Sequence, residues 1–199
     1  IETDSRWRFN ESGENFDASW AESGHPVGGN WKEGPGAIGF EAKLNDVIGT
    51  PLGRPTLKDP YVVTHYFERD FEIEPGILSR VAHINVSHLI DDGAVFYING
   101  TEVHRYNMPD GAIDFDTLAE DGTEGTWIDA SHLSADSLVA GSNRISVELH
   151  QSSRSSSDFV FGLMLDLAVG PEPVGESVLS GLVLNEISGA DDGGPVNVE

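Results

Sequence analysis

The stretch 88–105, HLIDDGAVFYINGTEVHR, constrains the fold more than any other part of the chain. Residues 94–98 are apolar and rich in β-branched and aromatic side chains, which is typical of a buried strand. Asn99-Gly100 supplies the two positive-φ residues that a tight hairpin turn requires, and residues 101–104 return antiparallel. The sequence therefore predicts a β-hairpin, with an Asp91-Asp92-Gly93 turn at one of its ends.

Two further segments, 80–89 and 143–151, alternate apolar and polar side chains with the period of two that strands require. In the second segment this pattern points Ser146, Glu148 and His150 outward, away from the core. The 23 glycines and 10 prolines are scattered rather than clustered, which suits many short turns between strands. We expect an all-β fold, an antiparallel jelly-roll β-sandwich with almost no helix.

Composition divides the chain into three parts. The strand patterns fall within residues 1–170, which we expect to form one sandwich domain. Residues 171–180 have the Pro, Glu, Gly and Ser content of a linker, and residues 181–199 follow as a separate segment.

Charge and residue usage exclude several classes of function. The chain has 34 acidic and 11 basic residues, for a formal net charge of −23. Binding to nucleic acid or to an anionic membrane surface rests on Lys and Arg, so neither partner is expected. No apolar run approaches the roughly 20 residues of a membrane-spanning helix. The absence of cysteine excludes disulfides, thiolate zinc sites and cysteine nucleophiles.

The acidic pair, the hairpin and the return strand ending near Arg105 resemble the galactose-binding-type jelly roll, in particular one that recurs in large secreted bacterial proteins. Gly141, Asn143, Val147 and His150 match the late strand of that family. One departure is that Glu68 stands where the family usually has an arginine, and Arg69 follows it.

The resemblance implies a domain of a multidomain bacterial protein that is extracellular or on the cell surface. Its expected partners are a polysaccharide or other glycan and the other domains of the same chain, and we expect a monomer. Residues 182–187, LVLNEI, resemble the opening strand of a lamin-tail-like domain, so 181–199 is either linker or the start of such a domain.

Sugar recognition requires polar groups that hydrogen-bond hydroxyls and an aromatic face for the C–H side of the ring. The candidates for the first task are Asp91, Asp92, Arg105, His150, Ser157 and Asp158, and those for the second are Tyr106 and Trp127. We expect them at one loop end of the sandwich, near the acidic pair. The alternative is that residues such as His150 and Asp158 only bond to neighbouring loops and hold the sandwich closed.

Adjacent carboxylates repel each other, and a turn that keeps them together often does so around a cation. Asp91 and Asp92, completed by backbone carbonyls, are therefore the predicted ligands of a structural calcium ion. The alternative is a solvated Asp-Gly turn. The acidic loop 106–126 lacks EF-hand spacing and is expected to be solvated.

No catalytic motif stands out: the chain has no Gly-x-Ser-x-Gly elbow, phosphate loop, dinucleotide fingerprint or His-Glu-x-x-His. The leading hypothesis is a non-catalytic carbohydrate-binding module, stabilised by calcium. The rival is a structural or spacer domain. A third hypothesis is an adhesin of the protective-antigen type that uses the acidic pair on calcium.

Overall fold

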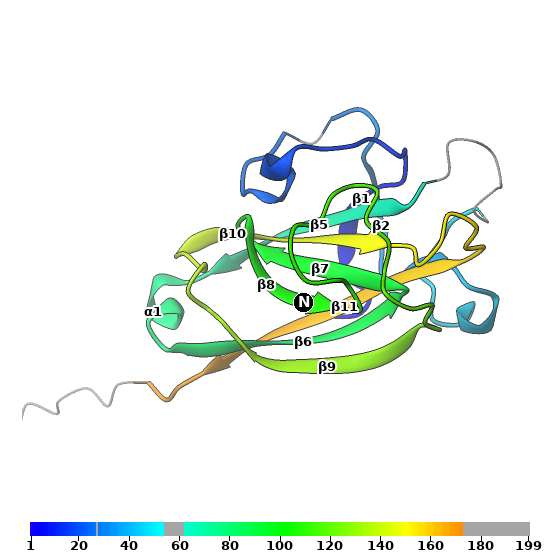
Figure 1. The fold of residues 1–199 in the computed structure, drawn as a ribbon. Coiled ribbons are helices and arrows are strands. Elements are labelled where there is room, and N and C mark those ends of the chain that lie inside the picture. Colours follow the sequence, from blue (N-terminus) through cyan, green and yellow to red (C-terminus); the bar gives the residue numbers. More distant parts are fainter. Residues whose placement is uncertain (27, 54–61, 173–199) are drawn as a thin grey trace, which may run out of the picture.

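The computed structural model describes residues 1–26, 28–53 and 62–172, which form two β-sheets packed face to face (Figure 1). Sheet A runs in the order β2 (Lys32–Pro35), β1 (Arg6–Asn10), β5 (Thr64–Ile73), β10 (Gly141–His150), β7 (Gly93–Ile98), β8 (Thr101–Tyr106). Sheet B runs in the order β4 (Thr50–Pro51), β3 (Ile38–Phe40), β11 (Phe159–Val169), β6 (Val81–Asp91), β9 (Thr126–Leu133). The linker predicted at 171–180 lies outside the described residues from 173 onward, as does the whole segment 181–199.

The predicted all-β, two-sheet jelly-roll architecture is confirmed. Strand pairs are antiparallel apart from β3 with β4. Helix in the described part of the chain is limited to the single turns η1 (Ala18–Ala21), η2 (Ala42–Leu44) and α1 (Pro75–Leu78). None of these turns has the length or hydrophobicity needed to cross a lipid bilayer.

The predicted hairpin forms between β7 and β8, with Asn99 (φ 50°) and Gly100 (φ 83°) at its turn. The Asn99 side chain also holds the turn against neighbouring structure, because its Oδ1 accepts from the Arg144 N–H at 2.8 Å and its Nδ2 donates to the Ser137 carbonyl at 2.8 Å. The local turn chemistry and the tertiary contacts therefore favour the same conformation.

The core lies between the inner faces of the two sheets. Phe67 of β5 stacks on Phe161 of β11 at 4.0 Å between ring centroids, and Trp7 meets Phe161 edge-on at 4.8 Å. These three side chains are at most 1% exposed. Complete burial of a large apolar side chain stabilises a fold by about 1.5–3 kcal/mol, so this aromatic contact across the sandwich is a main source of its stability.

The Asp91-Asp92-Gly93 segment is a corner rather than the end of one hairpin. Strand β6 ends at Asp91 in sheet B, and β7 begins at Gly93 in sheet A, so the chain changes sheets at Asp92. Both aspartates are only 3% exposed. The acidic pair is therefore buried at this corner instead of lying on a solvated turn.

The outer face of sheet A, the face turned away from the core, is covered over much of β10. Ser146, Glu148 and His150 alternate outward as predicted, yet they are 0%, 6% and 0% exposed. Ser146 lies 3.4 Å from the Ala21 carbonyl and His150 Nδ1 lies 2.8 Å from the Thr117 carbonyl, so two loops pack over this face.

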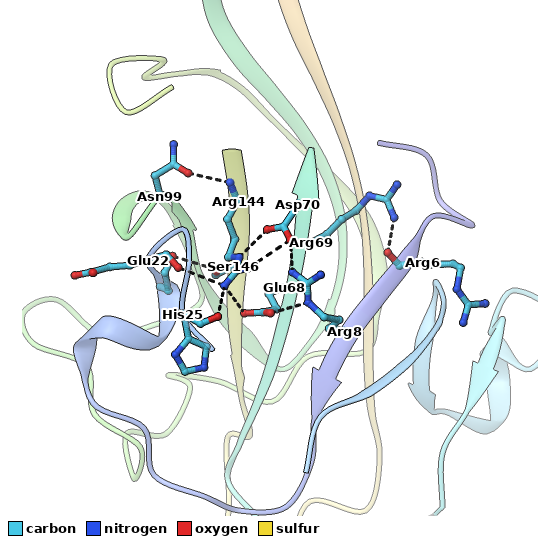
Figure 2. Close-up of polar contacts among 11 residues, drawn as sticks. Arg6, Arg8, Glu22, His25, Glu68, Arg69, Asp70, Asn99, Arg144 and Ser146 are labelled. Carbon is cyan, nitrogen blue, oxygen red and sulfur yellow. Dashed lines mark hydrogen bonds and ion pairs between the residues drawn. The ribbon is translucent and has the colours of Figure 1, made fainter. Parts of the chain in front are cut away.

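An ion-pair network fastens the first of these loops to sheet A (Figure 2). The Arg144 guanidinium donates to the carbonyls of Glu22 (3.4 Å) and His25 (3.2 Å) and to the fully buried Glu68 carboxylate (3.3 Å). Arg8 donates to the other oxygen of Glu68 at 2.7 Å. The Glu68 carboxylate is thus balanced by two arginines and forms the centre of the network.

Candidate functional site

The two aspartates of the corner have different surroundings. Asp92 Oδ1 accepts from the Thr123 N–H at 2.8 Å, and Oδ2 accepts from the Ser152 N–H at 2.7 Å. The Asp92 carbonyl accepts from the Thr123 hydroxyl at 2.9 Å and from Asn107 Nδ2 at 3.1 Å. Asp92 therefore joins three loops to the corner, and both of its carboxylate oxygens already have donors.

Asp91 instead faces two other carboxylates, those of Glu41 and Asp158, and the ligand atoms of the three lie within 4.8 Å of one another. Glu41 follows β3, and Asp158 precedes β11. Burial, together with the carboxylates of Asp92, Asp158 and Glu41, raises the pKa of Asp91 to about 8. Burial and the neighbouring Glu41 also raise the pKa of Asp158. The carboxylate cluster of Glu41, Asp91 and Asp158 concentrates negative charge, which a bound cation would stabilise.

The chemistry of the cluster fits a calcium ion better than a transition metal, because its ligands are all hard oxygen atoms. Gln151 contacts the backbone of one cluster residue, because its Nε2 donates to the Asp158 carbonyl at 3.1 Å. Gln151 is 1% exposed, and its Oε1 has no hydrogen-bond partner among the described residues. Glu41, Asp91 and Asp158 would hold the ion.

Trp127 lies on the outer face of sheet B, on the same face as the carboxylate cluster. It pairs with Leu89 across β9 and β6, and Leu89 stands two residues before Asp91, so their side chains share a face. The indole is 40% exposed. Its far edge comes within 3.2 Å of the point where a Cβ on Gly162 would lie, so the ring extends across the sheet surface over that glycine.

The apolar floor beside the indole is a small cluster separate from the main core. Ala37, Leu89 and Val160 form it, and Leu44 and Ile48 pack against its margin. The far edge of the Trp127 ring thus lies beside this cluster, near Gly162, while 40% of the residue meets solvent.

Arg105 and Tyr106 lie elsewhere, on the edge strand β8 of sheet A. The Arg105 guanidinium donates to both carboxylate oxygens of Glu102 (2.9 and 2.8 Å) and to the carbonyls of Pro109 and Gly111. Tyr106 is half-buried, and its ring packs 4.8 Å from that of His88 in the interior. Arg105 thus holds the loop after β8, and Tyr106 belongs to the margin of the core.

His150 and Ser157 complete the predicted set. His150 is fully buried, with Nδ1 near the Thr117 carbonyl (2.8 Å) and the Thr64 hydroxyl (3.0 Å). Ser157 is half-buried in the loop that leads to Asp158. Of the eight residues predicted for a glycan site, the structure brings Asp91, Asp158 and Trp127 to one face.

Sequence reasoning missed Glu41 as a member of this site. It lies 50 positions from Asp91, in a segment without clear periodicity, and joins the cluster only because β3 pairs with β11 beside Asp158. Its carboxylate also accepts the Lys43 N–H at 2.7 Å at the start of η2. No local signal separates this glutamate from the many other acids of the chain.

No family model matches the chain, and no curated protein matches it. Among solved structures it is similar to a β-D-mannosidase from Dictyoglomus thermophilum (TM-score 0.40, 16% identity, 76% of this chain and 15% of the enzyme). It is also similar to β-glucuronidases from Bifidobacterium dentium (TM-score 0.44, 14% identity, 74% and 19% covered) and Ruminococcus gnavus (TM-score 0.43, 14% identity, 80% and 28% covered).

These solved structures are glycoside hydrolases, and the chain spans less than a third of the length of each. At such TM-scores and identities the likeness carries no argument about activity. What the chain does must therefore be argued from its own side chains.

Proposed function

We propose that this β-sandwich is a non-catalytic carbohydrate-binding domain whose glycan site lies on the outer face of sheet B, around Trp127. The observation that carries the proposal is the position of this indole: exposed, extended over Gly162, and on the same face as the carboxylate cluster of Glu41, Asp91 and Asp158. An exposed aromatic face with polar groups beside it is the pair of features that sugar recognition requires.

In this account a sugar ring stacks its C–H side on the exposed side of the indole. The indole is placed by the pairing of Trp127 with the buried Leu89 and by its close approach to Gly162, so little side-chain freedom would be lost on binding. Polar residues on the same face of sheet B, Ser87 of β6 and the exposed Asp129 of β9, are within reach of ring hydroxyls because they pair with each other next to Trp127.

We further propose that calcium occupies the carboxylate cluster. Bound there, the ion would neutralise the buried negative charge and lock β3, β6 and the start of β11 together. Glu41, Asp91 and Asp158 would each contribute an oxygen, and Asp92 would act indirectly by fixing the corner through its bonds to Thr123 and Ser152.

We propose a location and partners that fit a glycan-binding domain. A glycan-binding sandwich with many acidic residues suits a multidomain protein that is extracellular or on the cell surface, where calcium is plentiful. The domain would act as a monomer, and its partners would be a polysaccharide and the other domains of its chain. A single shallow site binds weakly, so linked domains would supply avidity.

The alternative is a structural or adhesin domain without glycan binding of its own. The observation that favours it is the complete bonding of Asp92 and Arg105, which makes both residues structural supports. In that case the carboxylate cluster with its calcium would only stabilise the sandwich, and Trp127 would be an exposed side chain at the edge of the apolar packing.

A glycan array probed with the full chain, in calcium and in chelator, separates the two proposals. Carbohydrate binding predicts a defined group of bound glycans with signals that fall when calcium is removed. If a broad array shows no glycan bound in calcium, the spacer proposal replaces this one.

A further inference from the structure

A hollow on the opposite side of the molecule from Trp127 lies over the outer face of sheet A. It has a volume of about 270 Å³. Its floor is formed by side chains of three neighbouring strands, Tyr66 of β5, Glu148 of β10 and Tyr97 of β7. The loop that contains η1, with Phe16, Asp17 and Trp20, and the loop at 113–115, with Asp114 and Phe115, form its walls.

The walls of the hollow are aromatic and fixed. Trp20 meets Tyr66 at 4.7 Å and Tyr97 at 5.9 Å between ring centroids, and Phe16 meets Tyr66 at 5.0 Å. On the other side the Thr64 hydroxyl donates to the Phe115 carbonyl at 2.6 Å. The hollow is therefore formed before any ligand arrives.

The loop that carries Phe16 and Trp20 is held by contacts outside the hollow. Figure 2 shows the Arg144 guanidinium reaching the carbonyls of Glu22 and His25 just after η1. Arg144 and its partner Glu68 do not line the hollow, so they position the aromatic wall without occupying the space beside it.

The charged side chains that line the hollow are all acidic. Three carboxylates line it, those of Asp17, Asp114 and Glu148, and no Lys or Arg is among its lining residues. Glu148 is 6% exposed. Its Oε1 accepts from the Tyr97 hydroxyl at 2.5 Å, and His150 Nε2 lies 3.5 Å from its Oε2 on the side of β10.

We propose that this hollow binds a small organic ammonium ion, a positively charged nitrogen carried on a compact body such as choline or an amino sugar. Aromatic faces attract cations through their ring quadrupoles, most strongly where the site is partly desolvated. Carboxylates in the same space add direct attraction, and the net charge of −23 draws cations toward the molecule. A neutral sugar would gain neither the cation–π attraction nor the attraction to the carboxylates.

The proposal is independent of the glycan site. Trp127 and the carboxylate cluster belong to the outer face of sheet B, and the hollow to the outer face of sheet A. Loss of one site therefore leaves the other in place, and each can fail separately.

Calorimetric titration of the full chain tests the proposal, with choline chloride, glucosamine hydrochloride and neutral N-acetylglucosamine at constant ionic strength. Binding of either cation with no binding of N-acetylglucosamine supports the proposal and identifies the preferred ammonium type. Equal binding of glucosamine and N-acetylglucosamine, or no binding of either cation, overturns it.

Variants then locate the bound cation. Glu148→Gln removes one lining charge and should weaken binding about tenfold or more, the range for losing a charged hydrogen bond. Asp46→Asn removes one exposed charge on the β3–β4 connection of sheet B and should change the affinity little. If Glu148→Gln fails to fold, the exposed Asp114→Asn gives the same comparison. An affinity that falls equally in the lining variant and in Asp46→Asn contradicts a site in the hollow.

Discussion

The indole of Trp127 lies across Gly162, with 3.2 Å between its far edge and the position of a Cβ on that glycine. The same point is 3.2 Å from the Leu89 Cβ and 3.3 Å from the Ala37 Cβ, which are fixed to their backbones. Of these three neighbours only the indole can move away. Gly162 thus permits the close approach of the ring on which the proposed glycan site depends.

Replacing Gly162 by alanine should therefore displace the indole. We expect a loss of about 1–3 kcal/mol of unfolding free energy, the usual cost of overpacking, and a weaker affinity for glycan in proportion to the lost platform. Urea unfolding and glycan titration of the same variant measure the two effects. Unchanged glycan affinity in a folded Gly162→Ala protein would show that this close approach of the indole is not needed.

Removing calcium should lower stability. A ligand at a hundredfold excess over its Kd stabilises by about 2.7 kcal/mol, so chelator should lower Tm by roughly 5–10 °C for a domain of this size. Thermal unfolding with chelator, and with calcium restored, is the measurement. Glu41→Gln should abolish the calcium response, whereas Asp46→Asn, an exposed acid outside the cluster, should retain it. An identical Tm in calcium and in chelator would leave the cluster without its proposed ion.

The metal-free protein should lose stability as pH rises. The pKa of Asp91 is raised to about 8 in the folded chain from its ordinary 3.8, so between these values the folded state holds a proton that the unfolded chain releases. Asp91→Asn has no carboxyl to titrate at this position. In chelator, its unfolding free energy minus that of the parent protein should therefore rise from pH 4 to pH 8. Urea unfolding of both proteins across this interval checks the sign, and a parallel pair of curves would contradict it.

His88 should make the folded protein less stable as pH falls, the opposite of the effect of Asp91. It is fully buried in the interior without a hydrogen-bond partner for either nitrogen among the described residues, and burial lowers its pKa from 6.5 to about 4. The unfolded chain therefore binds the proton more readily, and stability is lost as pH falls from 6.5 toward 4. His88→Leu should lessen this loss, so its unfolding free energy relative to the parent should be higher at pH 5 than at pH 7.5. The same difference at both pH values would refute the assignment.

The fold could be predicted from the sequence because its signals are local. Asn99-Gly100 specifies a hairpin turn within two residues, and the alternation in 143–151 correctly separates Val147 from Glu148. The same alternation could not show that Glu148 and His150 are buried, because the loops that cover them come from distant parts of the chain.

The residues that make up the candidate site could be predicted from the sequence only in part. Asp91 and Asp92 are adjacent and chemically identical, yet one faces Glu41 and Asp158 while the other accepts two backbone N–H groups. Which aspartate takes which role depends on how the chain turns from sheet B into sheet A, and neither composition nor period encodes that turn.

The glycan site proposed at Trp127 is tested by comparing Trp127→Ala with Arg105→Ala in titrations of a glycan found on the array, with calcium present. Arg105 was a candidate from the sequence, but its guanidinium is engaged by Glu102 and two carbonyls on the other sheet. Val139→Ala, which truncates another exposed apolar side chain, serves as the control. We expect Trp127→Ala to weaken binding by more than about 1 kcal/mol, as truncation of an anchoring aromatic side chain does, while Arg105→Ala and Val139→Ala retain parental affinity. Loss of binding in Arg105→Ala with full affinity in Trp127→Ala would contradict it and return the site to the β8 edge.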